Sequence, residues 1–531
     1  MNGAAVQKSQ SWYNFLMILN TVSQVAENNK RIAKNMAMLY IRMFFIMAIT
    51  LYTSRVVLNV LGVVDFGIYN VVGGVVAMMG LFNSAMSVAT QRYLTFELGK
   101  GDQVRLKQVF SMCFTIFILL ALLILFLAET AGLWFLNAKL VIPISRMSAA
   151  NWLYQYSILT CIAALFVAPY NAAIIAHEKM DVYAYVGIIE VLLKLGVVFL
   201  LEYISFDRLP VYGFFLFLAQ VVVTGLYAVY SIRYYAECRY RFYWEKSLFR
   251  ELLSYSGWNI FGSLAALAKG QGLNILLNIF FTPTVNAARG IAYQINTAVT
   301  LFFTNFYTAV KPQVIKYYSQ GELMDMFKLV FRSSKMSFYL ILLISLPIII
   351  EAPFIIQLWL GQLPNYVVGF TRLIIVVSAI DALATPLMTV AHATGHIKLY
   401  QSLVGTMVIM NVPISYVFLK LGFSPYIVFY ISIFISIACL FTRLWIVHRL
   451  MPFPVKDYVV KVFGNSLMVG LMASLLPVFL HSLLDTSLAA VVAVCLVSLV
   501  SSCLCVYYVG LERDERLFVL QIVRKKLLKR I

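Results

Sequence analysis

The sequence predicts an all-α polytopic membrane protein with about 14 transmembrane helices. Of its 531 residues, 62% are hydrophobic and only 12% are charged. Apolar stretches recur along the whole chain, and nearly all approach the ~20 residues that a helix needs to cross ~30 Å of hydrocarbon. Lys and Arg are concentrated in every second connecting segment, which is the pattern that orients helices in a membrane.

The stretches follow one another with short connections, none of which is long enough to fold as a separate soluble domain. The ninth stretch is the shortest, and its apolar character continues through 353–360. The expected spans are residues 36–60, 66–90, 108–128, 152–174, 182–202, 211–231, 256–280, 285–308, 335–350, 367–391, 399–419, 425–447, 459–480 and 488–510.

The distribution of basic residues predicts that both termini are cytoplasmic. With the N-terminus inside, the outside loops contain few cations, namely Arg55, Lys139, Arg146, Arg208, Arg372 and Lys420. The formal net charge of +19 therefore resides mainly in cytoplasmic segments. There it fixes topology and meets anionic lipid headgroups, so no nucleic-acid partner is expected.

A faint internal repeat predicts two parallel, pseudo-symmetric six-helix lobes. A shift of 220 positions places Phe82 and Ala89 on Phe302 and Ala309, and a shift of 217 places Pro169 on Pro386. Parallel repeats imply a central cavity between the lobes and alternating access. The expected parts are a cytoplasmic lead (1–35), an N-lobe (36–231), a linker (232–255), a C-lobe (256–447), two further helices (448–510) and a basic cytoplasmic tail (511–531).

Lys269 is the strongest candidate in the sequence for a substrate-binding residue. It lies about thirteen residues into its span, roughly 20 Å from the cytoplasmic end, too deep to reach water easily. Gly270, Gln271 and Gly272 follow it and would allow an irregular backbone, which is tolerated at depth only beside protein or water. The alternative is a lysine that joins helices through backbone carbonyls.

Other charges within the spans have both functional and structural interpretations. Arg289 and Arg42 lie near span ends, where they could bind substrate or extend to an interface. Lys194 follows Glu190 by four residues, so the two can neutralise each other on one helix face. Asp381 could be a counter-ion, a proton carrier or a partner to hydroxyl groups, and together with Glu190 it is a candidate for coupling to H⁺ or Na⁺.

Basic residues outnumber acidic ones at depth, which predicts a cationic interior suited to an anion. Amides such as Gln271 and Asn274 recur along the seventh and eighth spans, where they could hydrogen-bond sugar hydroxyls or neighbouring helices. The sequence contains no Walker A loop, H-E-x-x-H or G-x-S-x-G motif, and its histidines do not cluster. No catalytic residue, metal site or cofactor is expected.

Four short segments carry a resemblance to a known family. Residues 58–74 read LNVLGVVDFGIYNVVGG, residues 89–102 read ATQRYLTFELGKGD, residues 285–292 read VNAARGIA and residues 311–313 read KPQ. These segments resemble the Wzx-type polysaccharide flippases of the MOP superfamily, which also contains the MATE exporters and the lipid II flippase. The helix number and two-lobe repeat agree with that family over about 36–510.

The resemblance implies transport of a polyprenyl-pyrophosphate-linked oligosaccharide across the bacterial inner membrane, for O-antigen, capsule or another surface polysaccharide. Lys269, Arg289 and Arg42 would hold the pyrophosphate, with Lys194, Gln271 and Asn274 as further cavity candidates. Membrane lipids and the proteins of glycan polymerisation and assembly would be partners.

Two other functions are compatible with a chain of many membrane spans. A MATE-type multidrug or cation antiporter shares the fold, but its carboxylates generally lie in the first or seventh helix, where this chain has Arg42 and Lys269 instead of Asp or Glu. A membrane-embedded polymerase or glycosyltransferase would have a large outside loop or an acidic donor site, and the sequence has neither. The flippase is therefore favoured over both.

Overall fold

The computed structural model describes residues 3–138, 142–281, 283–360, 364–484, 487–513 and 515–516, and leaves out the side chains of 3–30 and of several residues in 51–81. The described chain is helical and contains no strand. Most of the predicted tail and the side chains of most of the predicted lead lie outside the described residues, so those predictions remain open.

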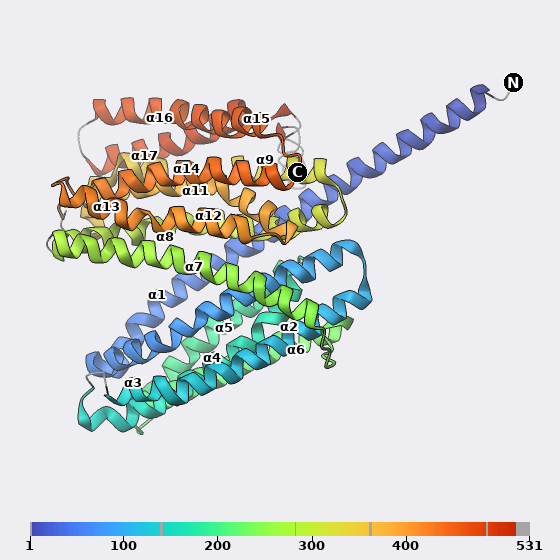
Figure 1. The fold of residues 1–531 in the computed structure, drawn as a ribbon. Coiled ribbons are helices and arrows are strands. Elements are labelled where there is room, and N and C mark those ends of the chain that lie inside the picture. The colour runs from blue at the N-terminus through green and yellow to red at the C-terminus, as the bar shows by residue number, and fades with distance from the viewer. Residues whose placement is uncertain are drawn as a thin grey trace, which may run out of the picture. The chain divides into compact units, whose positions relative to one another are not determined.

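The chain divides into two compact units (Figure 1). Unit 1 comprises 1–78 and 118–238, and unit 2 comprises 79–117 and 239–531. The end of the long helix α1, from residue 79, and the first part of α2 thus group with unit 2. The expected lobe boundaries at 36–231 and 256–447 remain a prediction.

Unit 1 is a helical bundle in which α4 packs extensively against α6, and α5 packs against both. A π-helical turn, Ala128–Gly132, precedes α3, and its Ala128 carbonyl accepts a hydrogen bond from the Tyr154 hydroxyl at 2.9 Å. The helices are α1 (Gly3–Lys100, which continues into unit 2), α2 (Gln103–Leu127, shared in the same way), α3 (Leu133–Ala138), α4 (Met147–Ala176), α5 (Met180–Glu202) and α6 (Arg208–Tyr234).

Glycine divides α1 into the first two predicted spans. At Gly62 the backbone leaves helical geometry, with φ 76° and ψ 167°. Residues with a β-carbon avoid this region, whereas glycine adopts it at no steric cost. The glycine in the 58–74 motif therefore has a definite structural role.

In unit 2, α11 is the central helix and packs against α8, α9 and α14. Its buried Phe370 packs with Phe429 of α14, their ring centroids 4.6 Å apart. The helices are α7 (Lys246–Phe280), α8 (Pro283–Ser319), α9 (Leu323–Ile350), α10 (Ala352–Leu360), α11 (Val367–Thr394), α12 (Lys398–Ile409), α13 (Asn411–Lys420), α14 (Ile427–Leu450), α15 (Val455–Tyr458), α16 (Asn465–Leu483) and α17 (Leu488–Cys505).

Twelve segments of the described residues are long and apolar enough to cross a membrane. The chain is a multi-pass membrane protein. The predicted spans 66–90 and 285–308 are absent from these twelve, and they lie within α1 and α8. The predicted span 399–419 is divided at Met410 into α12 and α13, because Pro413 has no N–H to continue the helical hydrogen bonds.

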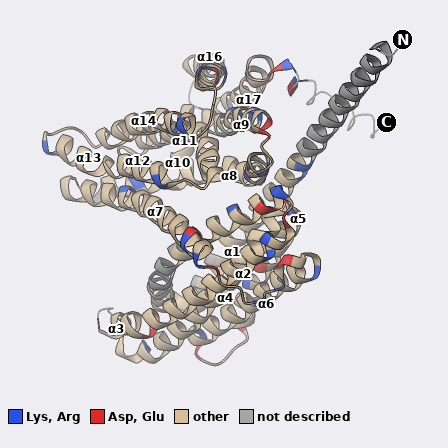
Figure 2. Cartoon of the chain, turned by 45° about the vertical axis from the view of Figure 1, so that its right-hand side comes forward, with Lys and Arg blue, Asp and Glu red and all other residues tan. Residues whose placement is uncertain are grey.

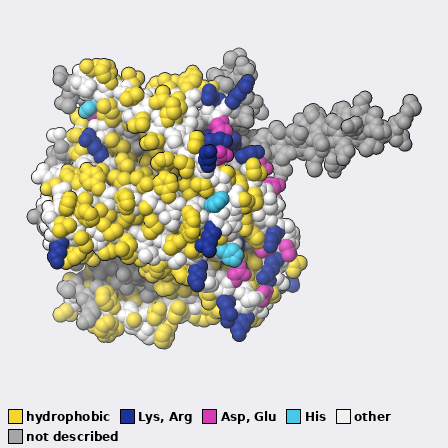
Figure 3. Space-filling view, turned by 45° about the horizontal axis from the view of Figure 1, so that its top comes forward, with side chains coloured by type: hydrophobic (Ala, Val, Ile, Leu, Met, Phe, Trp, Pro, Cys, Tyr) yellow, Lys and Arg dark blue, Asp and Glu magenta, His cyan; other side chains and the backbone are white. Residues whose placement is uncertain are grey.

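Charged side chains gather near the helix ends, and long stretches of the helices have none (Figure 2). Figure 3 shows a face covered largely by hydrophobic side chains, with most of its Lys and Arg toward one edge. In a soluble protein, apolar patches of this extent would be an aggregation hazard. On a membrane protein they are the surface that meets lipid.

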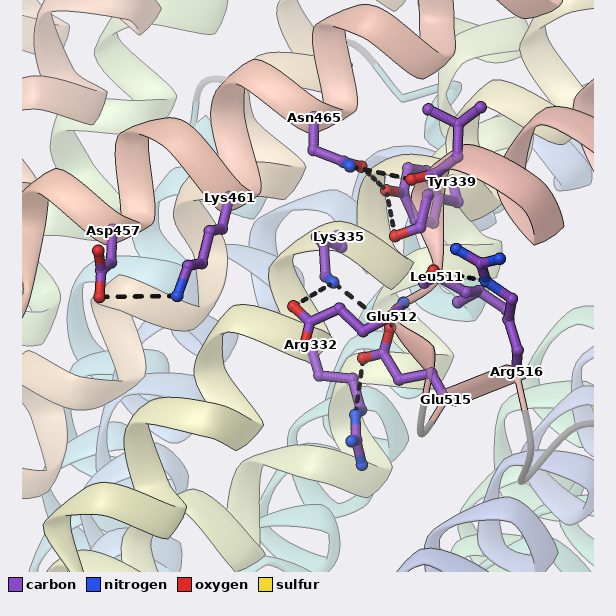
Figure 4. Close-up of polar contacts among 12 residues, drawn as sticks. Arg332, Lys335, Tyr339, Asp457, Lys461, Asn465, Leu511, Glu512, Glu515 and Arg516 are labelled. Atoms are coloured by element: carbon purple, nitrogen blue, oxygen red, sulfur yellow. Dashed lines mark hydrogen bonds and ion pairs between the residues drawn. The ribbon is translucent and has the colours of Figure 1, made fainter.

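A polar cluster holds the chain after α17 against α9 (Figure 4). The buried Lys335 ammonium lies 3.2 Å from a Glu512 oxygen and 3.4 Å from a Glu515 oxygen, and Arg332 donates to Glu515 at 2.9 Å. Nearby, the Tyr339 hydroxyl donates to Asn465 Oδ1 at 2.6 Å. These contacts link the last two spans to the rest of unit 2.

Candidate substrate site

Arg289 lies in a site made of neutral groups on α7 and α8. Its guanidinium donates to the Gly270 carbonyl at 2.9 Å and to Asn274 Oδ1 at 3.3 Å. The Tyr293 ring lies 4.3 Å away, close enough for a cation–π contact. Arg289 is only 7% exposed, and its buried Nε has no hydrogen-bond partner among the described residues.

These contacts fix the Arg289 side chain but do not neutralise it. Within the described part of the chain, Arg289 makes no ion pair with a carboxylate. A buried cation is costly unless it is compensated. The arrangement is therefore suited to receive a negatively charged ligand group, with the free Nε–H as one donor.

Lys269 precedes the carbonyl that Arg289 binds, but its surroundings differ from the expectation. The irregular backbone that Gly270 to Gly272 would allow is not formed, because α7 is an uninterrupted helix there. A β-carbon at Gly272 would lie 2.7 Å from Val412 Cγ2, so this glycine permits close packing with α13. Lys269 is half-buried and, among the described residues, has neither a hydrogen bond nor an ion pair.

Asp381 on α11 has Arg443 of α14 as its counter-ion, which is one of the three interpretations left open by the sequence. The two side chains are 4.0 Å apart, with Asp381 44% exposed and Arg443 13% exposed. Lys269 also acts electrostatically on Cys439, one helical turn before Arg443. The sequence analysis did not identify Arg443 as a candidate, because it lies near one end of its predicted span.

Unit 1 contains the other predicted site residues. The Arg42 guanidinium lies 4.2 Å from the Tyr183 ring centroid, and its Nε is buried without a hydrogen-bond partner among the described residues. Lys194 donates to Glu190 at 2.6 Å, which supports the structural interpretation of that pair.

The predicted residues thus fall into two groups. Lys269, Gln271, Asn274, Arg289 and Asp381 belong to unit 2, where Arg289 and Asn274 are in contact and Gln271 is exposed. Arg42, Lys194 and Glu190 belong to unit 1. The prediction that Arg42 shares a site with Lys269 and Arg289 stays a prediction.

The 89–102 motif forms a second polar site in unit 2. Arg92 donates to the carbonyls of His392 and Ala393, at 3.2 and 2.7 Å, where α11 ends. Tyr93 donates to Glu251 at 2.8 Å. Both residues border a cavity of about 470 Å³ that contains acidic and basic side chains. Burial is the main factor that raises the pKa of Glu97 in this cavity.

No family model matches the chain, and no curated protein matches its sequence. Solved structures do match. An outward-facing multidrug resistance MATE transporter of the MOP superfamily has a TM-score of 0.68 at 12% identity, covering 81% of this chain and 96% of its own. The fold is MATE-like.

Two further structures share this fold. A MOP superfamily transporter from Pyrococcus furiosus, described as having a binding pocket of reverse polarity, has a TM-score of 0.67 at 12% identity and covers 81% of this chain and 96% of its own. The MATE transporter ClbM in complex with Rb⁺ has a TM-score of 0.64 at 16% identity and covers 81% and 98%. The MATE-like fold thus extends over about four fifths of the chain.

Proposed function

We propose that this protein is a transporter that moves a polyprenyl-pyrophosphate-linked oligosaccharide across the bacterial inner membrane by alternating access, for the synthesis of a surface polysaccharide. The observation that carries the proposal is Arg289, a buried cation held by a carbonyl, an amide and an aromatic ring rather than by a carboxylate. A pyrophosphate group would supply the missing negative charge.

The MATE-like fold supports transport rather than catalysis, since its solved neighbours are described as transporters. The neighbour from Pyrococcus furiosus is described as having a pocket of reverse polarity and a suggested different function. The same fold is thus compatible with pockets of opposite charge. In this protein the unneutralised charge is positive, which favours an anionic substrate.

A MATE-type antiporter is the second candidate function, because the MATE fold neighbours include a multidrug transporter and a Rb⁺ complex. Such a protein would couple export to H⁺ or Na⁺ through a carboxylate. The two candidate carboxylates in the spans, Glu190 and Asp381, are both paired with cations of this chain. This pairing makes them weaker candidates for binding a free cation.

The deciding experiment uses a strain that lacks the gene. We expect completed lipid-linked oligosaccharide to accumulate in the inner leaflet and surface glycan to be lost, with drug sensitivity unchanged. Arg289→Gln should fail to restore surface glycan, whereas Arg289→Lys should restore part of it, at equal protein level in the membrane. Normal glycan with raised drug sensitivity in the deletion strain would establish the antiporter instead.

A further inference from the structure

Asp381 and Arg443 form a pair with unusual properties. Their charged atoms are 4.0 Å apart, the outer limit of an ion pair, and the Asp381 carboxylate accepts no hydrogen bond from the described residues. Thr385, one turn away on α11, donates to the Asp381 backbone carbonyl and not to its carboxylate. No hydrogen bond therefore fixes this pair, and a ligand that accepts hydrogen bonds from Arg443 can replace Asp381.

The exposed fraction of the Asp381 side chain indicates the environment of this pair. Its side chain is 44% exposed although the residue lies near the middle of a membrane-spanning helix. A carboxylate at that depth is too costly to face hydrocarbon, so the exposed side faces water. The pair therefore lies beside an aqueous space that a polar ligand can enter.

Arg443 keeps an unused donor beside this carboxylate. Its buried Nε has no hydrogen-bond partner among the described residues. Arg443 can therefore donate to a ligand through an atom that Asp381 does not occupy.

We propose that Arg443 forms a second anion-binding subsite, and that Asp381 is an internal carboxylate that competes with the substrate anion for Arg443. The inference rests on the proposed function, since it assigns this subsite to the pyrophosphate group. When substrate is absent, Asp381 partly neutralises Arg443. When pyrophosphate enters, its oxygens replace the carboxylate, and the return of Asp381 to Arg443 favours release.

The competition has a distinctive consequence, because removing Asp381 should strengthen substrate binding. A carboxylate that binds a coupling cation, or one that is needed only for folding, would have no such effect. We expect Asp381→Asn to bind a pyrophosphate probe about tenfold more tightly and to release substrate more slowly, so that transport falls. Arg443→Gln should weaken binding by a similar factor.

The test measures the dissociation constant of farnesyl pyrophosphate for purified full-length protein in detergent, with farnesol as the probe that lacks the anionic group. Inorganic pyrophosphate, added as a competitor, tells whether the anion alone suffices. Asp457→Asn and Arg449→Gln are matched controls, since Asp457 pairs with Lys461 and Arg449 contacts Trp445. Both controls should bind as the wild type does.

An unchanged or weaker affinity in Asp381→Asn would overturn the inference. Suppose that Asp381→Asn does not bind more tightly than the wild type, but Arg289→Gln abolishes binding. The proposed function would then stand, and only the competing role of Asp381 would be rejected. If neither the wild type nor Asp381→Asn bound farnesyl pyrophosphate, both proposals would fail. Since Asp and Asn have nearly the same shape, Asp381→Asn keeps the test valid even if Arg443→Gln does not fold.

Discussion

Replacing Arg92 should separate the end of α11 from α1. Arg92 is 4% exposed and donates to two carbonyls in the last turn of α11, of which the His392 carbonyl also accepts the Gly395 N–H. Its guanidinium also lies 4.4 Å from the Tyr93 ring and 4.7 Å from the Phe96 ring. Arg92→Met keeps the apolar stem but removes every donor and the charge.

The size of the effect follows from these contacts. A hydrogen bond to a charged group contributes about 1.5–3 kcal/mol, and a cation at a helix C-terminus adds about 0.3–1 kcal/mol. Since the hydrogen bond at 3.2 Å is weaker than the one at 2.7 Å, we expect Arg92→Met to lower the free energy of unfolding by about 4 kcal/mol. In a unit of this size, that corresponds to a fall in melting temperature of about 5 °C.

The assay is thermal unfolding of the detergent-solubilised protein, followed by size-exclusion chromatography of the fraction that stays folded. Arg92→Lys should lose about half as much stability, because lysine keeps the charge but lacks the planar guanidinium group with its several donors. Lys100→Met is the control, since Lys100 is exposed and only contacts the Phe96 ring at 4.5 Å. An Arg92→Met protein that melts with the wild type would refute the reasoning.

Two further predictions concern ion pairs of unit 2. Lys335→Met should lower the melting temperature because it leaves the buried Glu515 with one cation, Arg332, in place of two, and adding Glu515→Gln should recover part of the loss; additive losses would contradict this. The Arg105 guanidinium holds the pKa of Glu245 at about 2, below its unfolded value of about 4.3. The stability that this pair contributes is present above the unfolded pKa of Glu245 and is lost as pH falls toward 2. The melting temperature of Arg105→Gln should therefore fall less than that of the wild type between pH 5 and pH 3. An equal fall in both proteins would exclude the pair as the source of the pH dependence.

The fold class was predictable from the sequence because membrane spans are set by length and apolarity alone. Predicted and observed helices agree best where apolar residues run continuously, as at the start of α17. They differ where a helix extends into a polar segment. The predicted span 335–350 covers only the second half of α9, whose first half contains Asp325, Lys328 and Arg332.

The site was less predictable, since a sequence shows the depth of a charge but not its partner. Position within a predicted span identified Arg289 and Asp381 as candidates, yet their different surroundings depend on which helices pack together. Asp381 has a cation from α14, far along the chain, whereas Arg289 has a carbonyl from α7. Arg443 was missed because its burial depends on this packing and its position in the span suggested a cytoplasmic residue.

The structure also explains why short motifs resembled the flippases without identifying a binding site. Asp65 of the first motif binds Arg146, which also binds Asp207 and so joins α1 to the start of α6. Arg92 of the second motif holds the end of α11. These residues hold elements of the fold together. The third motif contributes Arg289, whose buried Nε has no hydrogen-bond partner among the described residues. A residue that stabilises a joint needs its charge satisfied within the protein, whereas a residue that binds substrate is useful only if part of its charge is left for the ligand. By this criterion Arg289 is the strongest substrate-binding candidate in unit 2.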